Sequence, residues 1–191
     1  MIDRLEQNNT LHDCTQRFEK LGIAYMLTGS MALVHYAMPR MTADIDVVVE
    51  IQSNDANKVI AEFEPDYYVP RDTVRQAIAR GSMFNLLHQQ SLIKIDCIIR
   101  RNDEYQNQAF ERRTKALYAK DFEIWIISRE DLILSKLNWA KKTNSEMQLR
   151  DAANILRHDY DQIYVATWSS KLGISDLLKK ALEMLKSTDA T

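Results

Sequence analysis

The chain has 191 residues, of which 46% are hydrophobic and 27% are charged, and its formal net charge is -2. This composition excludes a collagen-like chain, a Gly/Pro-rich disordered chain and, with only two cysteines, a disulfide-rich scaffold. Because 25 basic residues nearly balance 27 acidic ones, nucleic-acid binding would require a local basic patch. A chain of this length is expected to form one compact domain, with or without an appendage.

Neither a membrane span nor a signal peptide is expected. No segment approaches the roughly 18 consecutive apolar residues of a membrane helix, and the first residues lack a basic-then-apolar pattern. We therefore expect a cytoplasmic protein without a membrane partner. Cys14 and Cys97 lie in apolar patterns without Cys-x-x-Cys spacing, so both are expected to be small core residues.

The first elements are predicted to be a helix, a strand and a second helix. Apolar residues recur at three- and four-residue spacing over 10–21, which predicts an amphipathic helix ending near Gly22. The apolar run 23–27 predicts a short strand. It breaks at Thr28-Gly29-Ser30, and the following pattern is helical until Pro39.

The middle of the chain continues to mix strands and helices. A run of valines favours a buried strand over 45–51. The strand-like runs 82–88 and 92–99 are joined by three residues, which favours antiparallel pairing. Two helices, 55–64 and 71–80, and a strand, 122–127, complete the elements predicted for this part.

From Ser128 onward the pattern is helical. Ser128, followed by an acidic first turn, resembles an N-cap, and helices are expected at about 129–142 and 146–157. Two more helices are expected after them, with N-caps at Asp161 and Ser175. We therefore divide the chain into a mixed core, residues 1–127, and a helical subdomain, residues 128–191, that completes the substrate site.

Two short motifs carry residues suited to phosphate and metal binding. Gly29 and Ser30 open a helix, where free backbone N–H groups and the helix dipole favour a phosphate. Asp44 and Asp46 are two residues apart in a strand, so both point to one face and repel each other. A divalent cation shared with substrate phosphates is the usual way to neutralise such a pair.

Asp96 is a third carboxylate in an apolar strand. It shares one face of that strand with Lys94 and Ile98, and a buried acid needs a partner. A structural ion pair with Lys94 or Arg100 is one interpretation. The other is that this strand lies beside the one carrying Asp44 and Asp46, in which case three carboxylates converge on a two-metal site.

Gly29-Ser30, then Asp44-Ile45-Asp46 after thirteen residues, and later Asp96 resemble the signature of the nucleotidyltransferase superfamily of polymerase-beta type. The resemblance covers about residues 23–99. It implies an α/β (α+β) fold, a short mixed sheet backed by helices, and Mg²⁺-dependent transfer of a nucleoside monophosphate with release of pyrophosphate. Asp44, Asp46 and Asp96 would be the catalytic and metal residues for two Mg²⁺ ions, and Gly29 and Ser30 would bind the nucleotide.

A second resemblance covers the helical part. Residues 130–137 and 148–156 are similar to toxin-type transferases of the AbiEii/AbiGii kind, in which a helix Lys and a later Asp are further motifs. Lys136 is a cation within an apolar helix face, so it either extends to the edge of that face or binds phosphate. Asp151 is expected opposite the apolar stripe of its helix, where it binds substrate or pairs with a neighbouring Arg or Lys.

Other polar residues have two interpretations each. Arg40 and Thr42 precede the acidic strand, and the resemblance suggests that they bind the nucleotide, although Arg40 could equally be a solvated loop residue. Two Arg-rich pieces would form either a basic surface for RNA or a solvated face with compensating acids: Arg71, Arg75 and Arg80, and Arg112, Arg113 and Lys115.

Together these observations predict a magnesium-dependent nucleotidyltransferase. Its substrate would be a nucleoside triphosphate, and its acceptor hydroxyl would belong to RNA such as a transfer RNA, to a protein or to a small molecule. The toxin-type resemblance adds a possible cognate antitoxin as partner. The alternatives are a non-catalytic nucleotide-binding or interaction module with the same fold, and a metal-dependent phosphohydrolase.

Overall fold

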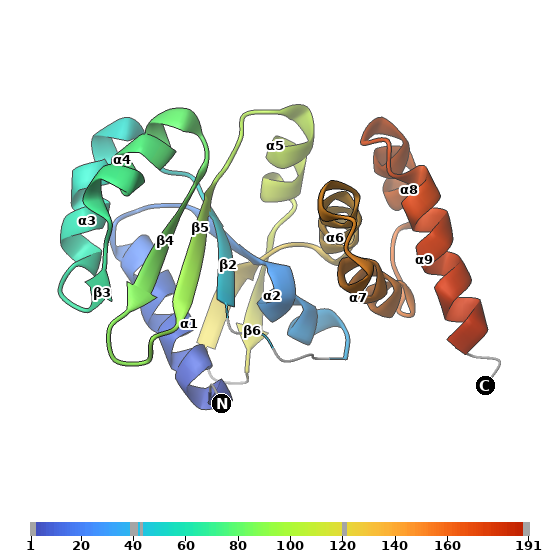
Figure 1. Cartoon of the computed structure of the whole chain (residues 1–191), viewed down its shortest axis with the longest axis horizontal. Helices are drawn as coiled ribbons and strands as arrows, with labels where there is room; N and C mark the ends of the chain where they lie inside the picture. The colour runs from blue at the N-terminus through green and yellow to red at the C-terminus, as the bar shows by residue number, and fades with distance from the viewer. Residues whose placement is uncertain (1–2, 39–41, 43, 120–121, 189–191) are drawn as a thin grey trace.

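The structure, a computed structural model, describes residues 3–38, 42, 44–119 and 122–188, and these form a mixed sheet with helices around it (Figure 1). The strands are β1 (Tyr25–Thr28), β2 (Asp44–Val49), β3 (Tyr67–Tyr68), β4 (Met83–His88), β5 (Lys94–Ile99), β6 (Thr114–Tyr118) and β7 (Phe122–Ile126). Their order in the sheet is β3-β4-β5-β2-β1-β7-β6. This confirms the predicted α/β (α+β) class with a mixed sheet backed by helices.

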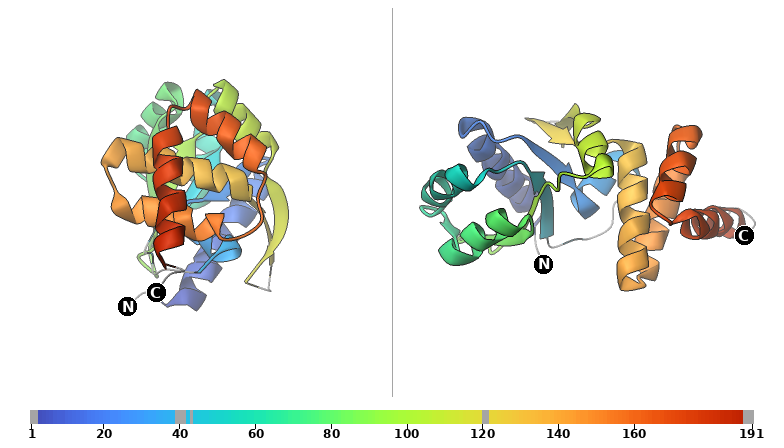
Figure 2. Two further views of the ribbon diagram at one scale, coloured as in Figure 1. Left: turned by 90° about the vertical axis from the view of Figure 1, so that its right-hand side faces the viewer. Right: turned by 90° about the horizontal axis from the view of Figure 1, so that it is seen from above.

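The helices cover the sheet and then extend away from one side of it. They are α1 (Arg4–Lys20), α2 (Gly29–Tyr36), the 3-10 turn η1 (Ser53–Asp55), α3 (Ala56–Phe63), α4 (Arg71–Arg80), α5 (Glu104–Glu111), α6 (Arg129–Thr143), α7 (Glu146–Leu156), α8 (Gln162–Lys171) and α9 (Ser175–Thr188). Helix α2 lies between the sheet and α6 and α7, whereas α8 and α9 lie farther out (Figures 1 and 2). Within the described residues, no helix has the length and apolarity needed to cross a bilayer.

The central strands present an apolar face and a polar face. Ile45 and Val47 on β2 lie beside Ile95 and Cys97 on β5, and all four side chains are fully buried. Because side chains alternate along a strand, Asp46, between the first two, points to the opposite face. Helix α2 packs against β2. The predicted antiparallel pairing of β4 with β5 is also confirmed.

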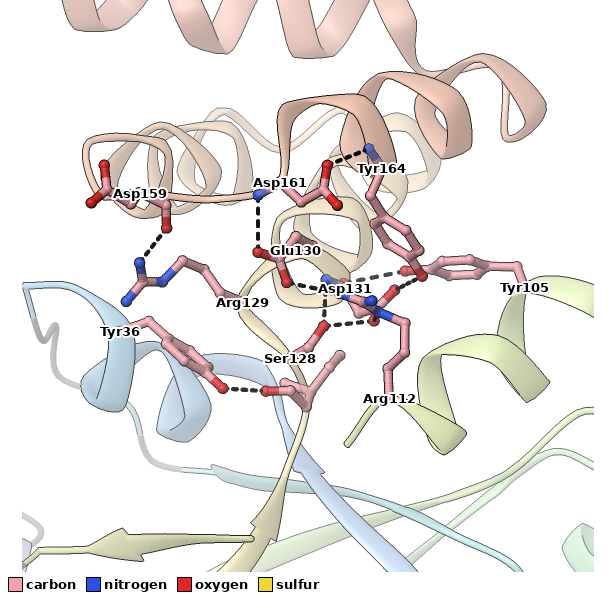
Figure 3. Close-up of polar contacts among 11 residues, drawn as sticks. Tyr36, Tyr105, Arg112, Ser128, Arg129, Glu130, Asp131, Asp159, Asp161 and Tyr164 are labelled. Carbon is pink, nitrogen blue, oxygen red and sulfur yellow. Dashed lines mark hydrogen bonds and ion pairs between the residues drawn. The ribbon is translucent and has the colours of Figure 1, made fainter. Parts of the chain in front are cut away.

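Helix α6 begins at a buried polar cluster, here called the joint, which consists of Ser128, Asp131, Arg112 and Tyr164 (Figure 3). The Ser128 hydroxyl accepts a hydrogen bond from the Asp131 backbone N–H at 3.1 Å, which confirms the predicted N-cap. The fully buried Asp131 carboxylate accepts hydrogen bonds from the Tyr164 hydroxyl at 2.8 Å and from Ser128 at 2.6 Å. Arg112, just after α5, pairs with it at 3.2 Å. One carboxylate therefore connects α5, α6 and α8.

Two of the arginines that the sequence placed in a possible basic surface, Arg112 and Arg113, have intramolecular partners. Arg112 pairs with Glu130 at 3.0 Å and lies over the Tyr164 ring, 4.0 Å from its centroid. Arg113 lies over the rings of Phe110 and Trp125. Both guanidinium groups thus serve intramolecular packing, which favours the interpretation with compensating contacts over an RNA-binding surface.

Three short elements, β3, α5 and β6, were not predicted from the sequence. Strand β6 is mostly exposed at the sheet edge, so it lacks the alternating burial that reveals a strand. Helix α5 buries only three side chains, although Asp103 caps it by accepting from the Gln106 N–H at 2.8 Å. Helix α1 starts at Arg4, earlier than predicted, because Asp3 caps a polar first turn.

Replacing Asp131 by Ala is expected to lower the free energy of unfolding by about 3–5 kcal/mol, because it leaves the Arg112 cation and two hydroxyls without their buried partner. The matched control is Asp72→Ala, also in the first turn of a helix. Asp72 pairs with Arg75 at 3.3 Å, but its side chain is 90% exposed, so the loss should stay below about 1 kcal/mol. Urea denaturation measures both, and equal losses would contradict this account of the joint.

Candidate functional site

A row of four polar residues crosses the polar face of the sheet. Thr28 on β1 lies beside Asp46 on β2, Asp46 beside Asp96 on β5, and Asp96 beside Asn85 on β4. Directly paired residues on neighbouring strands point to the same face. Asp44 lies two residues before Asp46 and shares this face. The expected adjacency of the two acidic strands is therefore confirmed.

Asp46 is the least compensated of the three acids. Its side chain is partly buried, and among the described residues no hydrogen-bond donor reaches its carboxylate. Burial raises the pKa of Asp46 above its ordinary value, and the negative charges of Asp96 and Asp44 act in the same direction. The cations Lys136 and Lys94 oppose this shift without cancelling it. Asp46 is thus a carboxylate that would gain from an additional cation.

Asp96, in contrast, is bound by neighbours at both oxygens. The Lys94 Nζ lies 3.1 Å from its Oδ2, and the Asn85 amide donates to its Oδ1. Lys94 also lies 3.4 Å from Asp44 Oδ2. Of the two partners that the sequence offered for Asp96, the structure has Lys94, because Arg100 pairs with Glu50.

The contacts with Asp96 and Asp44 stabilise the protonated form of Lys94. Burial alone would lower its pKa, but the hydrogen bond to Asp96 and the charges of Asp96 and Asp44 raise it above the ordinary value. Lys94 is therefore a cation at neutral pH.

Gly29 brings the start of α2 into contact with the acids. Its φ is +65°, and a Cβ at this position would lie 1.9 Å from Asp46 Oδ2. Only glycine combines this backbone conformation with such a close approach. The N-cap residue Thr28 makes no side-chain hydrogen bond to the first turn, and that turn contains no acidic residue. The N-terminus of α2, with its donor groups and positive dipole end, therefore lies against Asp46.

Lys136 forms a buried ion pair behind this helix. Its Nζ lies 2.8 Å from Asp151 Oδ2 and 3.4 Å from Ser30 Oγ, and its side chain is only 4% exposed. It does not extend to the edge of the helix face. The pair links α6 and α7 to the first turn of α2.

The predicted position of Asp151 on the outer side of α7 is wrong. Asp151 is buried on α7 together with Leu149, Ala152 and Ala153, and it faces Lys136. The buried side of α7 is wider than the predicted stripe and includes Asp151 at its edge. A buried carboxylate requires a partner, and the Lys136 ammonium provides it. Of the two alternatives for Asp151, the structure therefore has the pairing with a lysine.

The loop before β2 contributes one described residue. The Thr42 carbonyl accepts a hydrogen bond from the Gln7 side chain at 3.2 Å, and the Thr42 hydroxyl donates to the Asp44 carbonyl at 3.4 Å. These contacts connect α1 to the start of the acidic strand. Arg40, which was also expected to bind the nucleotide, lies outside the described residues.

The donor chemistry of the acids fits Mg²⁺, which prefers carboxylate oxygens. Their arrangement is not that of a formed metal site: among the described residues, no three His, Cys, Asp or Glu side chains are placed to hold an ion. Lys94 lies between Asp44 and Asp96, and both Asp96 oxygens already accept hydrogen bonds. Asp46 remains the carboxylate that lacks a donor within the described part of the chain.

Replacing Asp46 by Asn is expected to stabilise the metal-free protein near neutral pH. Because the folded state raises the Asp46 pKa, folding favours the protonated carboxyl. The free energy of unfolding of the wild-type protein therefore falls as the pH rises through the Asp46 pKa of the folded state. Asn carries no charge, so the gain should be present at about pH 7 and should vanish below the ordinary Asp pKa of about 3.9. Urea denaturation of both proteins in EDTA across this range measures the difference, and a variant less stable than wild type near pH 7 would contradict the prediction.

Comparison with known structures gives the same fold at low sequence identity. An antigenic nucleotidyltransferase-like protein from Paracoccidioides brasiliensis aligns with a TM-score of 0.52 at 17% identity, covering 81% of this chain and 76% of that one. The lincosamide antibiotic adenylyltransferase LnuA, lincomycin-bound, aligns with 0.52 at 18% identity, covering 81% and 97%. The antibiotic-resistance factor ANT(2'')-Ia aligns with 0.51 at 13% identity, covering 98% and 93%.

The family comparison reaches beyond the fold. No match was found among curated proteins. Residues 4–163 match the model of a family described as "Nucleotidyltransferase of unknown function (DUF6036)". The matched region includes the acidic strands, the start of α2 and the buried ion pair. The chain belongs to this family of nucleotidyltransferases.

Proposed function

We propose that this protein transfers a nucleoside monophosphate from a nucleoside triphosphate to an acceptor hydroxyl, with Mg²⁺ as cofactor. The observation that carries the proposal is the contact between Gly29 and Asp46, which brings a helix N-terminus against a carboxylate without a described hydrogen-bond donor. A helix N-terminus favours a phosphate, and a carboxylate without a donor favours a cation. A metal-bound triphosphate satisfies both at once.

The nucleotide would be held by the start of α2 and by the cation behind it. Backbone N–H groups of Gly29 and Ser30 would donate to phosphate oxygens. Lys136, 3.4 Å from the Ser30 hydroxyl, would offset part of the triphosphate charge. Asp151 would hold Lys136 in place through their 2.8 Å ion pair. Thr42 and Arg40 belong to the same proposed binding region.

The three acids would carry the chemistry. Asp44 and Asp46 would hold Mg²⁺, and two ions are expected in the full complex. When bound, the metal neutralises the developing phosphate charge and polarises the reacting oxygens. Asp96 would either accept the proton of the acceptor hydroxyl or contribute to the second ion. For the first role, each Asp96 oxygen keeps a second lone pair beside the hydrogen bond that it accepts from Lys94 or Asn85.

Three classes of acceptor fit the proposed transfer. The toxin-type resemblance favours RNA, such as a transfer RNA, or a protein, and implies a cognate antitoxin in the cytoplasm. LnuA and ANT(2'')-Ia are described as antibiotic-resistance proteins, which makes a small hydroxylated molecule the third acceptor class. At 18% and 13% identity these two share the fold, so they do not select among the classes.

A non-catalytic nucleotide-binding module is the second candidate. The ammonium of Lys94 between Asp44 and Asp96 favours it, because a like charge at this place opposes the divalent ion that transfer would need. Such a module would bind the triphosphate without turnover. A phosphohydrolase would instead release phosphate without transferring the nucleotide.

Incubation of the protein with α-labelled nucleoside triphosphates, Mg²⁺ and cell extract is expected to label one of three fractions: RNA, protein or small molecules. Asp44→Asn and Asp46→Asn should each lower transfer about a thousandfold or more, since a metal supplies several kcal/mol of transition-state stabilisation. Asp72→Asn, at an exposed ion pair on α4, is the control. Full transfer by a folded Asp46→Asn protein would contradict the mechanism, and nucleotide binding without transfer would favour the non-catalytic module.

Gly29→Ala is expected to abolish binding of the triphosphate with Mg²⁺, because the new methyl group would displace Asp46 and enter the phosphate site. Gly81→Ala is the matched control: its φ is +60°, but no atom lies within 4 Å of the added Cβ. Gly81→Ala should lose about 1–2 kcal/mol of stability through left-handed strain alone. Gly29→Ala should lose more, because its methyl group also displaces Asp46. Isothermal titration with a non-hydrolysable nucleotide measures binding, and equal affinities of the two variants would contradict a phosphate site at the start of α2.

A further inference from the structure

Lys94 occupies an unusual position for a lysine in a strand. It lies beside Asp44 in the register of β5 and β2, and it is two residues from Asp96 on its own strand. Its Nζ lies 3.1 Å from Asp96 Oδ2 and 3.4 Å from Asp44 Oδ2. A single ammonium thus bridges two of the three carboxylates. A cation shared by these two acids would have to occupy the same space.

The surroundings of Lys94 allow it to move. Its side chain is 40% exposed, whereas that of Lys136, a second cation near the acids in the described part of the chain, is 4% exposed. A lysine ammonium is a compact charge on a flexible stem, so Lys94 can exchange Asp44, whose side chain is 46% exposed, for another anion at small cost. Asp96 is only 12% exposed, but it keeps the hydrogen bond from the Asn85 amide when Lys94 moves. Lys136 cannot leave Asp151 without abandoning a buried charge. The two lysines therefore differ in kind: one is fixed and the other is displaceable.

We propose that Lys94 is a displaceable internal counter-ion that couples metal binding to nucleotide binding. In the nucleotide-free protein it bridges Asp44 and Asp96 and disfavours a divalent ion there. A triphosphate offers Lys94 new anionic partners, so the ammonium can move and the carboxylates become available to the ion. This inference rests on the proposed function and deepens it, because it states when the metal binds.

The coupling follows from electrostatics. A divalent ion arriving alone meets a like charge at Lys94 and must displace it into water. An ion arriving with a triphosphate brings negative charge that removes this penalty. By thermodynamic linkage, each ligand then raises the affinity for the other by the same factor. Free Mg²⁺ would bind weakly, whereas the complex of Mg²⁺ with nucleotide would bind well.

The test is a titration of the full-length protein with Mn²⁺, in which electron paramagnetic resonance counts the free ion, with and without a non-hydrolysable nucleoside triphosphate. Lys94→Met keeps the aliphatic stem and removes the charge. In the absence of nucleotide it should bind Mn²⁺ with an about tenfold lower Kd than wild type, because two partly exposed ion pairs no longer compete. The nucleotide should then strengthen Mn²⁺ binding by a smaller factor than in wild type.

Two controls separate charge from general effects. Lys94→Arg retains the cation and should bind Mn²⁺ as weakly as wild type. Lys115→Met removes a strand lysine of similar exposure that pairs with Glu123 at 3.4 Å, and it should also leave the Mn²⁺ affinity unchanged. Circular dichroism and thermal denaturation verify that each variant is folded before it is titrated.

The outcomes distinguish this inference from the proposed function. If Asp46→Asn abolishes Mn²⁺ binding but Lys94→Met binds as wild type does, the counter-ion role is overturned and the metal site stands. If Mn²⁺ binds wild type and Asp46→Asn equally, the proposed metal site fails, and the role of Lys94 fails with it. Tighter binding by Lys94→Met, lost again in Lys94→Met combined with Asp46→Asn, supports both.

Discussion

Two carboxylates, Asp46 and Asp96, lie side by side on adjacent parallel strands, and the rest of the site is organised around their repulsion. Lys94 and Asn85 compensate Asp96 from one side, while the start of α2 contacts Asp46 from the other. Farther out, the buried pair of Lys136 with Asp151 fixes α6 and α7 against α2. The compensation is incomplete at Asp46, and this residual charge is the physical basis of the metal and nucleotide binding that we propose.

The sequence was sufficient to predict the regular part of this arrangement. A run of valines over 45–51 and the strand-like run 92–99 identified the acidic strands, because one face of each is fully buried. The Ser128 N-cap could also be predicted, because capping depends only on residues within one helical turn. The proximity of Asp44 and Asp46 to Asp96 required only that two strands be neighbours, a condition that the register of β2 and β5 fulfils.

The remaining features depend on contacts between segments far apart in the chain. Asp151 was placed on the wrong side of α7, because its partner Lys136 comes from another helix and helical spacing does not reveal it. The choice between Lys94 and Arg100 as the partner of Asp96 depended on Glu50, which follows β2 and pairs with Arg100, so that Lys94 is the cation at Asp96. Edge strand β6 and helix α5 bury too little surface to produce a clear pattern.

The most direct test of the central claim is a crystal structure with Mn²⁺ and a non-hydrolysable nucleoside triphosphate. The account predicts an anomalous Mn²⁺ peak bonded to Asp44 and Asp46, phosphates at the N–H groups of Gly29 and Ser30, and Lys94 moved away from Asp96. A metal and triphosphate bound elsewhere on the protein, with Asp46 still without a cation, would contradict it.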